Sequence, residues 1–173
     1  MNIRTSLKFA AAAIALAGFC ATADAAQAPK VSITALSQLA TPLPYPYDEK
    51  ADANAAVDAA FARAKKSGKR VFIDLGGNWC GDCRVLAGLM ELPEVKAFID
   101  AHYEVVTVDV GRFDKNLQIP ARFGITTRLE GVPSVIIADA DGTFIDKDHI
   151  AALADARHMD PQSIADWLAK WAK

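Results

Sequence analysis

Apolar residues recur at helical spacing in several parts of this chain. Val57, Ala60, Phe61 and Ala64 share one face of a helix predicted over residues 48–67. Four further helices are predicted: Pro93 and Pro161 suit the first turns of two of them, whereas Pro120 disturbs a short one. They are expected from about residue 80 to before residue 93, over residues 93–99, over residues 116–123 and after residue 160.

Short runs of β-branched residues between these helices predict strands. Residues 71–75 form an apolar run typical of a central strand, and residues 103–110 are rich in valine. Residues 135–137 and 143–145 are predicted to pair as a hairpin, because the turn sequence of residues 139–142 separates them. The order α-β-α-α-β-α-β-β-α predicts an α/β fold with a central mixed β-sheet flanked by helices.

The N-terminal region has a different pattern. Arg4 and Lys8 precede an uncharged run, and Ala23-Asp24-Ala25 offers a small-x-small cleavage pattern, so residues 1–25 are predicted to be a signal peptide. The run is shorter than the roughly 18–20 residues that span a bilayer as a helix, which leaves a membrane anchor as the lesser alternative. A lipid on Cys20 is a second alternative, although the bulky residue before it does not suit lipoprotein processing.

Residues 26–47 are polar and punctuated by prolines. Alternating prolines remove backbone donors and oppose helix formation, so this segment is predicted to be an extended arm before a domain over residues 48–173. Tyr45 and Tyr47 are expected to pack the arm onto that domain. A docking site for a partner that recognises proline motifs is the alternative.

Composition and cysteine count restrict the classes of function. The chain has 173 residues, enough for one domain, with 19 Lys+Arg against 21 Asp+Glu. Without a basic block, the net charge of −2 argues against a nucleic-acid surface. Removal of residues 1–25 leaves two cysteines, Cys80 and Cys83, and an oxidising compartment outside the cytoplasm would let them cycle or persist as a disulfide.

The candidate chemistry lies in the sequence Trp79-Cys80-Gly81-Asp82-Cys83, at the junction between a predicted strand and a predicted helix. The N–H groups and positive dipole end of a helix N-terminus stabilise a thiolate, and a thiolate is the species that attacks disulfides. The second cysteine lies within one helical turn and can attack the resulting mixed disulfide. Cys80 is therefore the predicted nucleophile and Cys83 the predicted resolving thiol.

Other uses of a C-x-x-C pair fit less well. A zinc site would need a second ligand pair, but the chain has no second C-x-x-C, and His102, His149 and His158 lack paired spacing near the first. A structural disulfide closing so small a loop would stabilise the fold little. A Cu(I)-binding chaperone using both thiolates is a further alternative that would want a third ligand such as Met90. We expect neither a metal nor a cofactor.

Taken together, these motifs resemble the thioredoxin superfamily. The resemblance rests on the strand of residues 71–75, the Trp-Cys-x-x-Cys helix start and Gly131-Val132-Pro133-Ser134 before a strand, and it covers about residues 57–173. It implies the thioredoxin fold and thiol–disulfide exchange. It also implies a cis bond before Pro133, which would lie against the cysteine pair while Val132 presents its backbone to a substrate strand. Without the resemblance, an ordinary trans turn proline would be the simpler interpretation.

The resemblance gives Asp74, six residues before Cys80, the place of a buried acid beneath the active site. A carboxylate in an apolar strand should have a raised pKa and could accept the proton of Cys83, although a solvated aspartate at the strand end is the alternative. Trp79 is expected to shield and shape the site, and plain packing explains it equally well. Gly81 and Asp82 complete the expected substrate-facing turn.

Two departures from the family pattern matter. Asp82 stands where thioredoxins proper carry proline, and its charge should disfavour the Cys80 thiolate. A less stabilised thiolate makes the protein a weaker oxidant, so we expect a potential of roughly −200 to −270 mV. The segment of residues 125–130 is longer than in minimal thioredoxins, so it either alters the groove beside Pro133 or is a plain surface loop.

These observations predict an exported, monomeric thiol:disulfide oxidoreductase of the periplasm or another exported location. We expect it to reduce protein disulfides through a Cys80 mixed disulfide that Cys83 resolves. Its partners would be protein thiols and disulfides, and the resemblance implies a membrane thiol transporter as electron donor. A protein oxidant using the same residues in the opposite direction is the alternative.

Overall fold

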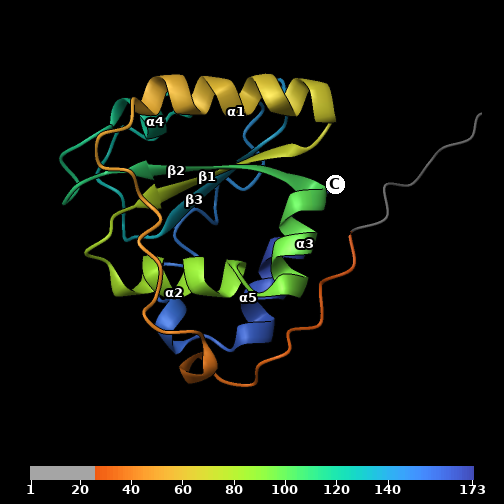
Figure 1. Cartoon of the computed structure of the whole chain (residues 1–173). Coiled ribbons are helices and arrows are strands. Elements are labelled where there is room, and N and C mark those ends of the chain that lie inside the picture. The colour runs from red at the N-terminus through yellow and green to blue at the C-terminus, as the bar shows by residue number, and fades with distance from the viewer. Residues whose placement is uncertain (1–25) are drawn as a thin grey trace, which may run out of the picture.

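A three-stranded sheet lies between two layers of helices in the computed structural model, which describes residues 26–173 (Figure 1). Helix α1 (Ala53–Ser67) covers one face of the sheet. The other face is covered by α2 (Gly81–Met90), α3 (Pro93–His102) and α5 (Pro161–Lys170). This is the predicted α/β architecture of a thioredoxin-like fold.

The sheet has the order β2-β1-β3 and is mixed. The central strand β1 (Arg70–Gly76) pairs in parallel with β2 (Tyr103–Asp109) and antiparallel with β3 (Ser134–Ala138). Because β1 has a neighbour on each side and helices on both faces, six of its seven residues are buried. Its carboxyl end, where the cysteine motif follows, therefore has a fixed position.

The predicted strand over residues 143–145 is wrong. The turn before it does form, since the N–H of Gly142 donates to the carbonyl of Asp139, but an isolated bridge between Ala138 and Phe144 replaces a second strand. The buried carboxylate of Asp146 explains this, because it accepts the N–H of Ile137 at 2.8 Å. Two backbone hydrogen bonds, from Ile145 N–H to the Ile137 carbonyl and from Asp139 N–H to the Thr143 carbonyl, still join this segment to the end of β3. The Asp146 side chain takes the place of the next backbone bond, so the pairing stops there.

The helices agree with the predicted elements and differ at their ends. Helix α1 starts at Ala53 instead of residue 48, because the side chain of Asp52 caps it by accepting the N–H of Ala55. Helix α4 (Gln118–Ala121) is shorter than predicted, whereas α3 runs three residues further than residue 99. A 3-10 turn, η2 (Ala156–His158), precedes α5.

The core has two parts, one on each face of the sheet. Between the sheet and helices α2, α3 and α5 lie Phe72, Leu86, Leu89, Ile137 and Leu168. Between the sheet and α1 lie Val57, Ala60, Ile73, Leu75 and Ile136. Burial of the larger of these apolar side chains stabilises a fold by about 1.5–3 kcal/mol each, so β1 and α2 are held firmly where they meet.

The segment of residues 26–47, here called the arm, passes below α2 and then runs up past the strand ends to α1 (Figure 1). It contains a 3-10 turn, η1 (Leu36–Gln38), and is otherwise irregular. The expectation for its tyrosines is half right. Tyr47 is 3% exposed and packs into the domain, but Tyr45 is 65% exposed, with the guanidinium of Arg84 3.9 Å from its ring centre.

The predicted signal peptide, residues 1–25, lies outside the described residues. From residue 26 onward, no helix is long and apolar enough to cross a bilayer.

Candidate active site

The two cysteines lie where β1 leads into α2. Cys80 is the N-cap residue of α2, and its Sγ accepts the N–H of Cys83 at 3.1 Å. A sulfur in this position receives a helix N–H group directly and lies at the positive end of the helix dipole. The strand-to-helix junction predicted from the sequence thus provides the environment that stabilises a thiolate.

Cys80 and Cys83 form a disulfide across this first turn, with Cα atoms 5.3 Å apart. Cys83 is completely buried, whereas Cys80 retains some exposure. A substrate therefore reaches the sulfur of Cys80 first, which suits Cys80 as attacking thiol and Cys83 as resolving thiol.

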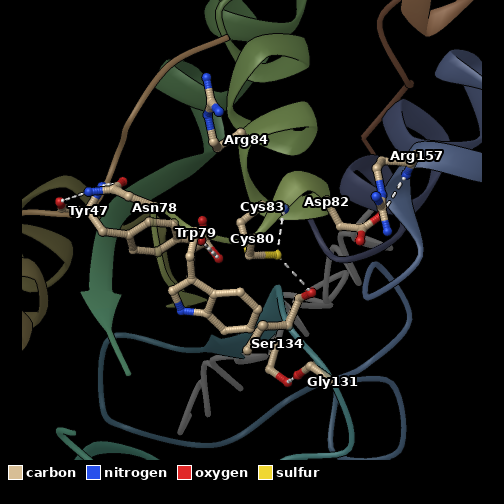
Figure 2. The surroundings of a disulfide bond; sticks show 12 residues. Tyr47, Asn78, Trp79, Cys80, Asp82, Cys83, Arg84, Gly131, Ser134 and Arg157 are labelled. Atoms are coloured by element: carbon tan, nitrogen blue, oxygen red, sulfur yellow. Dashed lines mark hydrogen bonds and ion pairs between the residues drawn. A yellow bond between two sulfur atoms is a disulfide. The ribbon is translucent and has the colours of Figure 1, made fainter. Parts of the chain in front are cut away.

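The loop before β3 closes over Cys80 (Figure 2). Its Val132–Pro133 peptide bond is cis, and the carbonyl oxygen of Val132 lies 3.3 Å from the Sγ of Cys80. The hydroxyl of Ser134 donates to the carbonyl of Gly131 at 2.7 Å and ties the loop together. The backbone of Val132 is thus placed next to the sulfur that a substrate would approach.

Asp74 lies beneath the cysteines on β1 and is 2% exposed. Burial raises the pKa of its carboxyl to about 7, and a hydrogen bond from the Tyr47 hydroxyl to Oδ1, at 2.9 Å, acts in the opposite direction. Burial and the neighbouring Asp74 also raise the pKa of the Tyr47 phenol. The expected burial of Asp74 is confirmed, and the direction of its pKa follows from that burial. Its role in proton transfer stays a prediction.

The sequence suggests that Asp82 acts as a free charge beside Cys80, but in the structure this carboxylate is paired. Its Oδ1 accepts hydrogen bonds from the backbone N–H and the Nε of Arg157, at 2.9 and 3.0 Å (Figure 2). A Cβ on Gly81 would lie 3.3 Å from the Arg157 side chain, so this cation is close to the active-site turn. Sequence reasoning missed Arg157, because it lies 75 residues from Asp82 and belongs to no local motif.

Trp79 forms the rim of the site and is 43% exposed. Its indole N–H donates to the carbonyl of Gly111 at 2.7 Å, and its ring packs edge-on against Phe113. The guanidinium of Arg112 lies over the indole, 4.7 Å from the ring centre. Trp79 is therefore held in place and still offers a face to solvent, which agrees with a role in shaping the site.

A cavity of about 330 Å³ adjoins this rim. Phe113 lines it together with Leu117 and with part of the predicted long segment, Ile125 to Leu129. Residues 125–129 thus form one wall of a hollow that begins at the ring packed against Trp79.

Metal ligands are not gathered at the cysteines. Within residues 26–173, no group of three or more His, Cys, Asp or Glu side chains is placed to hold a metal ion. The Cu(I) alternative therefore lacks a third ligand of these types in the described part of the chain.

Comparison with known proteins agrees with this geometry. A family model described as thioredoxin-like matches residues 52–140. The chain belongs to the thioredoxin-like family. It is 34% identical over 80 residues to a thioredoxin of Alicyclobacillus acidocaldarius subsp. acidocaldarius, a match that covers 46% of this chain and 68% of the relative.

This chain is similar to a solved structure described as a disulphide isomerase from Xylella fastidiosa Temecula1. It has 39% sequence identity and a TM-score of 0.68, and the match covers 74% of this chain and 97% of that one. With the Cys80–Cys83 pair in place, this thioredoxin-like protein is a thiol–disulfide oxidoreductase.

Proposed function

We propose that this protein is an exported reductant of protein disulfides. The observation that carries the proposal is the position of Cys80, at the first turn of α2 with its sulfur 3.3 Å from the Val132 carbonyl and Cys83 buried behind it. An approaching chain that pairs with the backbone of Val132 would bring a disulfide to the sulfur of Cys80. The substrate class is therefore protein disulfides.

The reaction has two steps. The Cys80 thiolate attacks one sulfur of the substrate disulfide, the substrate S–S bond breaks, and the other substrate sulfur leaves as a thiolate. Cys83 then gives its proton to the Asp74 carboxylate and attacks the Sγ of Cys80, which releases the second substrate sulfur. The substrate gains two electrons and this protein becomes the Cys80–Cys83 disulfide. An external dithiol, for which we propose a membrane thiol donor, must reduce that disulfide again.

The charges near Cys80 support the reducing direction. Strong oxidants owe their potential to a stabilised reduced form, in which the attacking thiolate lies in electropositive surroundings. Here the cation beside the active-site turn, Arg157, is already paired with Asp82. The pair leaves little net charge to stabilise the thiolate beyond the helix N-terminus, and we retain a potential of roughly −200 to −270 mV.

Equilibration of the purified protein with glutathione buffers tests the direction. A value within that range supports a reductant, and a value near that of the strong oxidants, about −120 mV, contradicts it and favours the oxidant. The same preparation tests the copper alternative, since tight stoichiometric Cu(I) binding without disulfide reductase activity would favour a metal chaperone.

A Cys83→Ser variant tests the partners and the place of action. Without its resolving thiol, Cys80 should stay joined to natural substrates, and the complexes should be found in the periplasmic or otherwise exported fraction, on a protein that has lost residues 1–25. The matched control is Cys80→Ser, which should trap nothing. Equal trapping by both variants would contradict the assignment of the two thiols.

Disulfide isomerisation is a second candidate function, because the similar structure from Xylella fastidiosa is described as a disulphide isomerase. The same residues would serve, with the substrate's own thiol displacing Cys80 before Cys83 acts. Refolding of a scrambled substrate separates the two. An isomerase retains activity in the Cys83→Ser variant, whereas a reductant loses it.

A further inference from the structure

The arm contributes a side chain to the interior of the active site. Tyr47 is 3% exposed, and its hydroxyl donates to Oδ1 of Asp74 at 2.9 Å. The matched family region starts at residue 52, so Tyr47 lies outside the part of the chain that the family model describes. The contact is therefore a feature of this chain that the family match does not supply.

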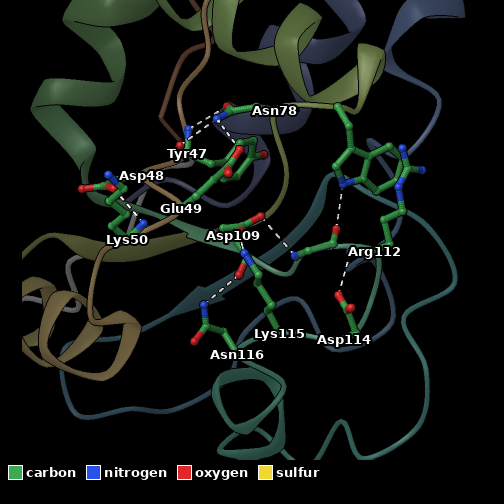
Figure 3. Close-up of polar contacts among 12 residues, drawn as sticks. Tyr47, Asp48, Glu49, Lys50, Asn78, Asp109, Arg112, Asp114, Lys115 and Asn116 are labelled. Atoms are coloured by element: carbon green, nitrogen blue, oxygen red, sulfur yellow. Dashed lines mark hydrogen bonds and ion pairs between the residues drawn. The ribbon is translucent and has the colours of Figure 1, made fainter.

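The main chain around Tyr47 is fixed on both sides. The Tyr47 N–H donates to Oδ1 of Asn78 at 3.1 Å, and Nδ2 of Asn78 donates to the Tyr47 carbonyl at 2.8 Å (Figure 3). One residue earlier, the carbonyl of Pro46 accepts the Thr107 hydroxyl at 2.9 Å. Asn78 is two residues before Cys80, so the arm is tied directly to the active-site turn.

The Tyr47 hydroxyl, which binds the Asp74 carboxyl, and the Cys83 sulfur both lie beside the backbone of Gly76. Gly76 is two residues after Asp74 on β1 and points to the same side of the sheet. A Cβ at Gly76 would collide with the Tyr47 hydroxyl and would lie 2.8 Å from the Sγ of Cys83. The missing side chain leaves the space in which Tyr47 and Cys83 approach each other above Asp74.

We propose that Tyr47 is a positioning residue for thiol–disulfide exchange: its hydroxyl holds the Asp74 carboxylate in the orientation that takes the proton from Cys83. A hydrogen bond donated to a carboxylate stabilises the charged form and offsets the cost of its burial. Asp74 then remains available as a base close to neutral pH. Tyr47 keeps its own proton throughout, and the proton of Cys83 moves to Asp74 alone.

The other charged groups near this pair are few. From β2, Asp109 acts on Tyr47 and raises the pKa of the phenol, and it is itself paired with Lys115 at 3.2 Å. Helix α2 contributes the two cysteines, and β3 places the uncharged Val135 beside Asp74. Among the described residues, the Tyr47 hydroxyl donates the one side-chain hydrogen bond that Asp74 accepts.

The test is a Tyr47→Phe variant of the whole protein, which keeps the ring and removes the hydroxyl. The measurement is the rate at which Cys83 resolves a preformed mixed disulfide on Cys80, as a function of pH. Because the carboxylate loses its donor, the pH range in which the resolution rate rises, here called the rising limb, should move upward by about one pH unit. At a pH below this range the rate should fall about tenfold. The rate should recover at alkaline pH, which a merely structural defect would not produce.

Three controls make the outcome decisive. Tyr45→Phe, in the exposed tyrosine of the same arm, should leave the profile unchanged. In an Asp74→Asn background, Tyr47→Phe should add no further effect on the profile. An NMR titration of the Asp74 carboxyl should show its pKa higher in Tyr47→Phe than in the wild type, and this readout needs no catalysis.

An unchanged pH profile, or an unchanged Asp74 titration, overturns the proposal. The inference rests on the proposed function, in which Asp74 accepts the proton of Cys83, but the two can fail separately. If the Asp74→Asn variant resolves mixed disulfides as fast as the wild type, the proposed proton transfer fails. If Asp74 matters and Tyr47→Phe does not move the limb, only the role of Tyr47 fails.

Discussion

Asp74 is the residue on which the pH dependence of the second step should depend. Its pKa is raised to about 7 by burial, so the fraction that can accept a proton rises through neutral pH. We predict that resolution of the mixed disulfide accelerates with pH around 7 in the wild type. Asp74→Asn should slow it about 100-fold at pH 8 and remove this limb, because an amide accepts no proton.

The control for this variant is the first step, since attack by Cys80 does not use Asp74. Formation of the mixed disulfide in Asp74→Asn should be close to wild type when it is followed by stopped-flow fluorescence. Equal loss in both steps would indicate a general distortion of the site instead of a lost base.

Arg157 should affect the acidity of Cys80 through Asp82. Arg157→Gln leaves the Asp82 carboxylate without its cation, so the Cys80 thiolate becomes less favourable and its pKa should rise. The side chain of Arg157 is partly exposed to screening solvent, and the expected shift is below about one unit. The pH dependence of alkylation of the reduced protein measures it. The double variant Asp82→Asn/Arg157→Gln removes both charges and should return the value toward wild type.

At the scale of elements, the close approach of β1 to α2 leaves no room at Gly76. Gly76→Ala places a methyl group 2.8 Å from the Cys83 sulfur and against Tyr47, so it should destabilise the protein by about 1–3 kcal/mol in urea unfolding. Gly88→Ala is the matched control within α2. Its Cβ would lie 3.1 Å from the end of the Leu43 side chain, with Leu39 and Pro44 at ordinary contact distances of 3.5 and 3.6 Å. Alanine also favours the helix, so no loss of stability is expected.

The sequence predicted the elements that local patterns specify and missed those that distant contacts decide. The strand before the cysteines and the helix starting at Cys80 follow from hydrophobic spacing and capping. The absence of a strand over residues 143–145 does not follow from these patterns, because it depends on the Asp146 carboxylate accepting the N–H of Ile137. No periodicity shows that a side chain will take the N–H that the next residue of a paired strand would bind.

The same distinction applies to the site. The cysteine pair, and Asp74 six residues before it, could be found because they lie in one continuous strand–turn–helix segment. Tyr47 and Arg157 could not, since they lie 27 and 75 residues away from their partners and arrive through tertiary packing. A tyrosine in a proline-rich segment gives no sign that its hydroxyl will reach a buried acid.

For the whole molecule, the buried acids make stability depend on pH in an uncommon direction. Burial raises the pKa of Asp74 to about 7 and that of Asp146 to about 6, from an ordinary value of 3.8. Between about pH 5 and 7 the folded protein therefore binds more protons than the unfolded chain, and stability should fall as pH rises. Glu104 and Asp139 have lowered pKa values and act oppositely, but only at more acid pH.

Urea unfolding of the oxidised protein between pH 4 and 8 measures this dependence. We expect the largest free energy of unfolding near pH ~5, and a flatter profile in Asp146→Asn, which keeps an acceptor for the Ile137 N–H and cannot ionise. Stability that increases steadily from pH 5 to pH 7 would contradict the assignment of these two acids.

The packing of the Tyr47 side chain into the active site also has a practical consequence for the production of this protein. A fragment cut at residue 52, where the family match starts, would retain both cysteines, the sheet and the helices. It would lack the phenol that fills the space above Gly76, and water could enter there beside the carboxyl. Such a shortened domain would look complete by every motif and would still differ chemically from the full protein.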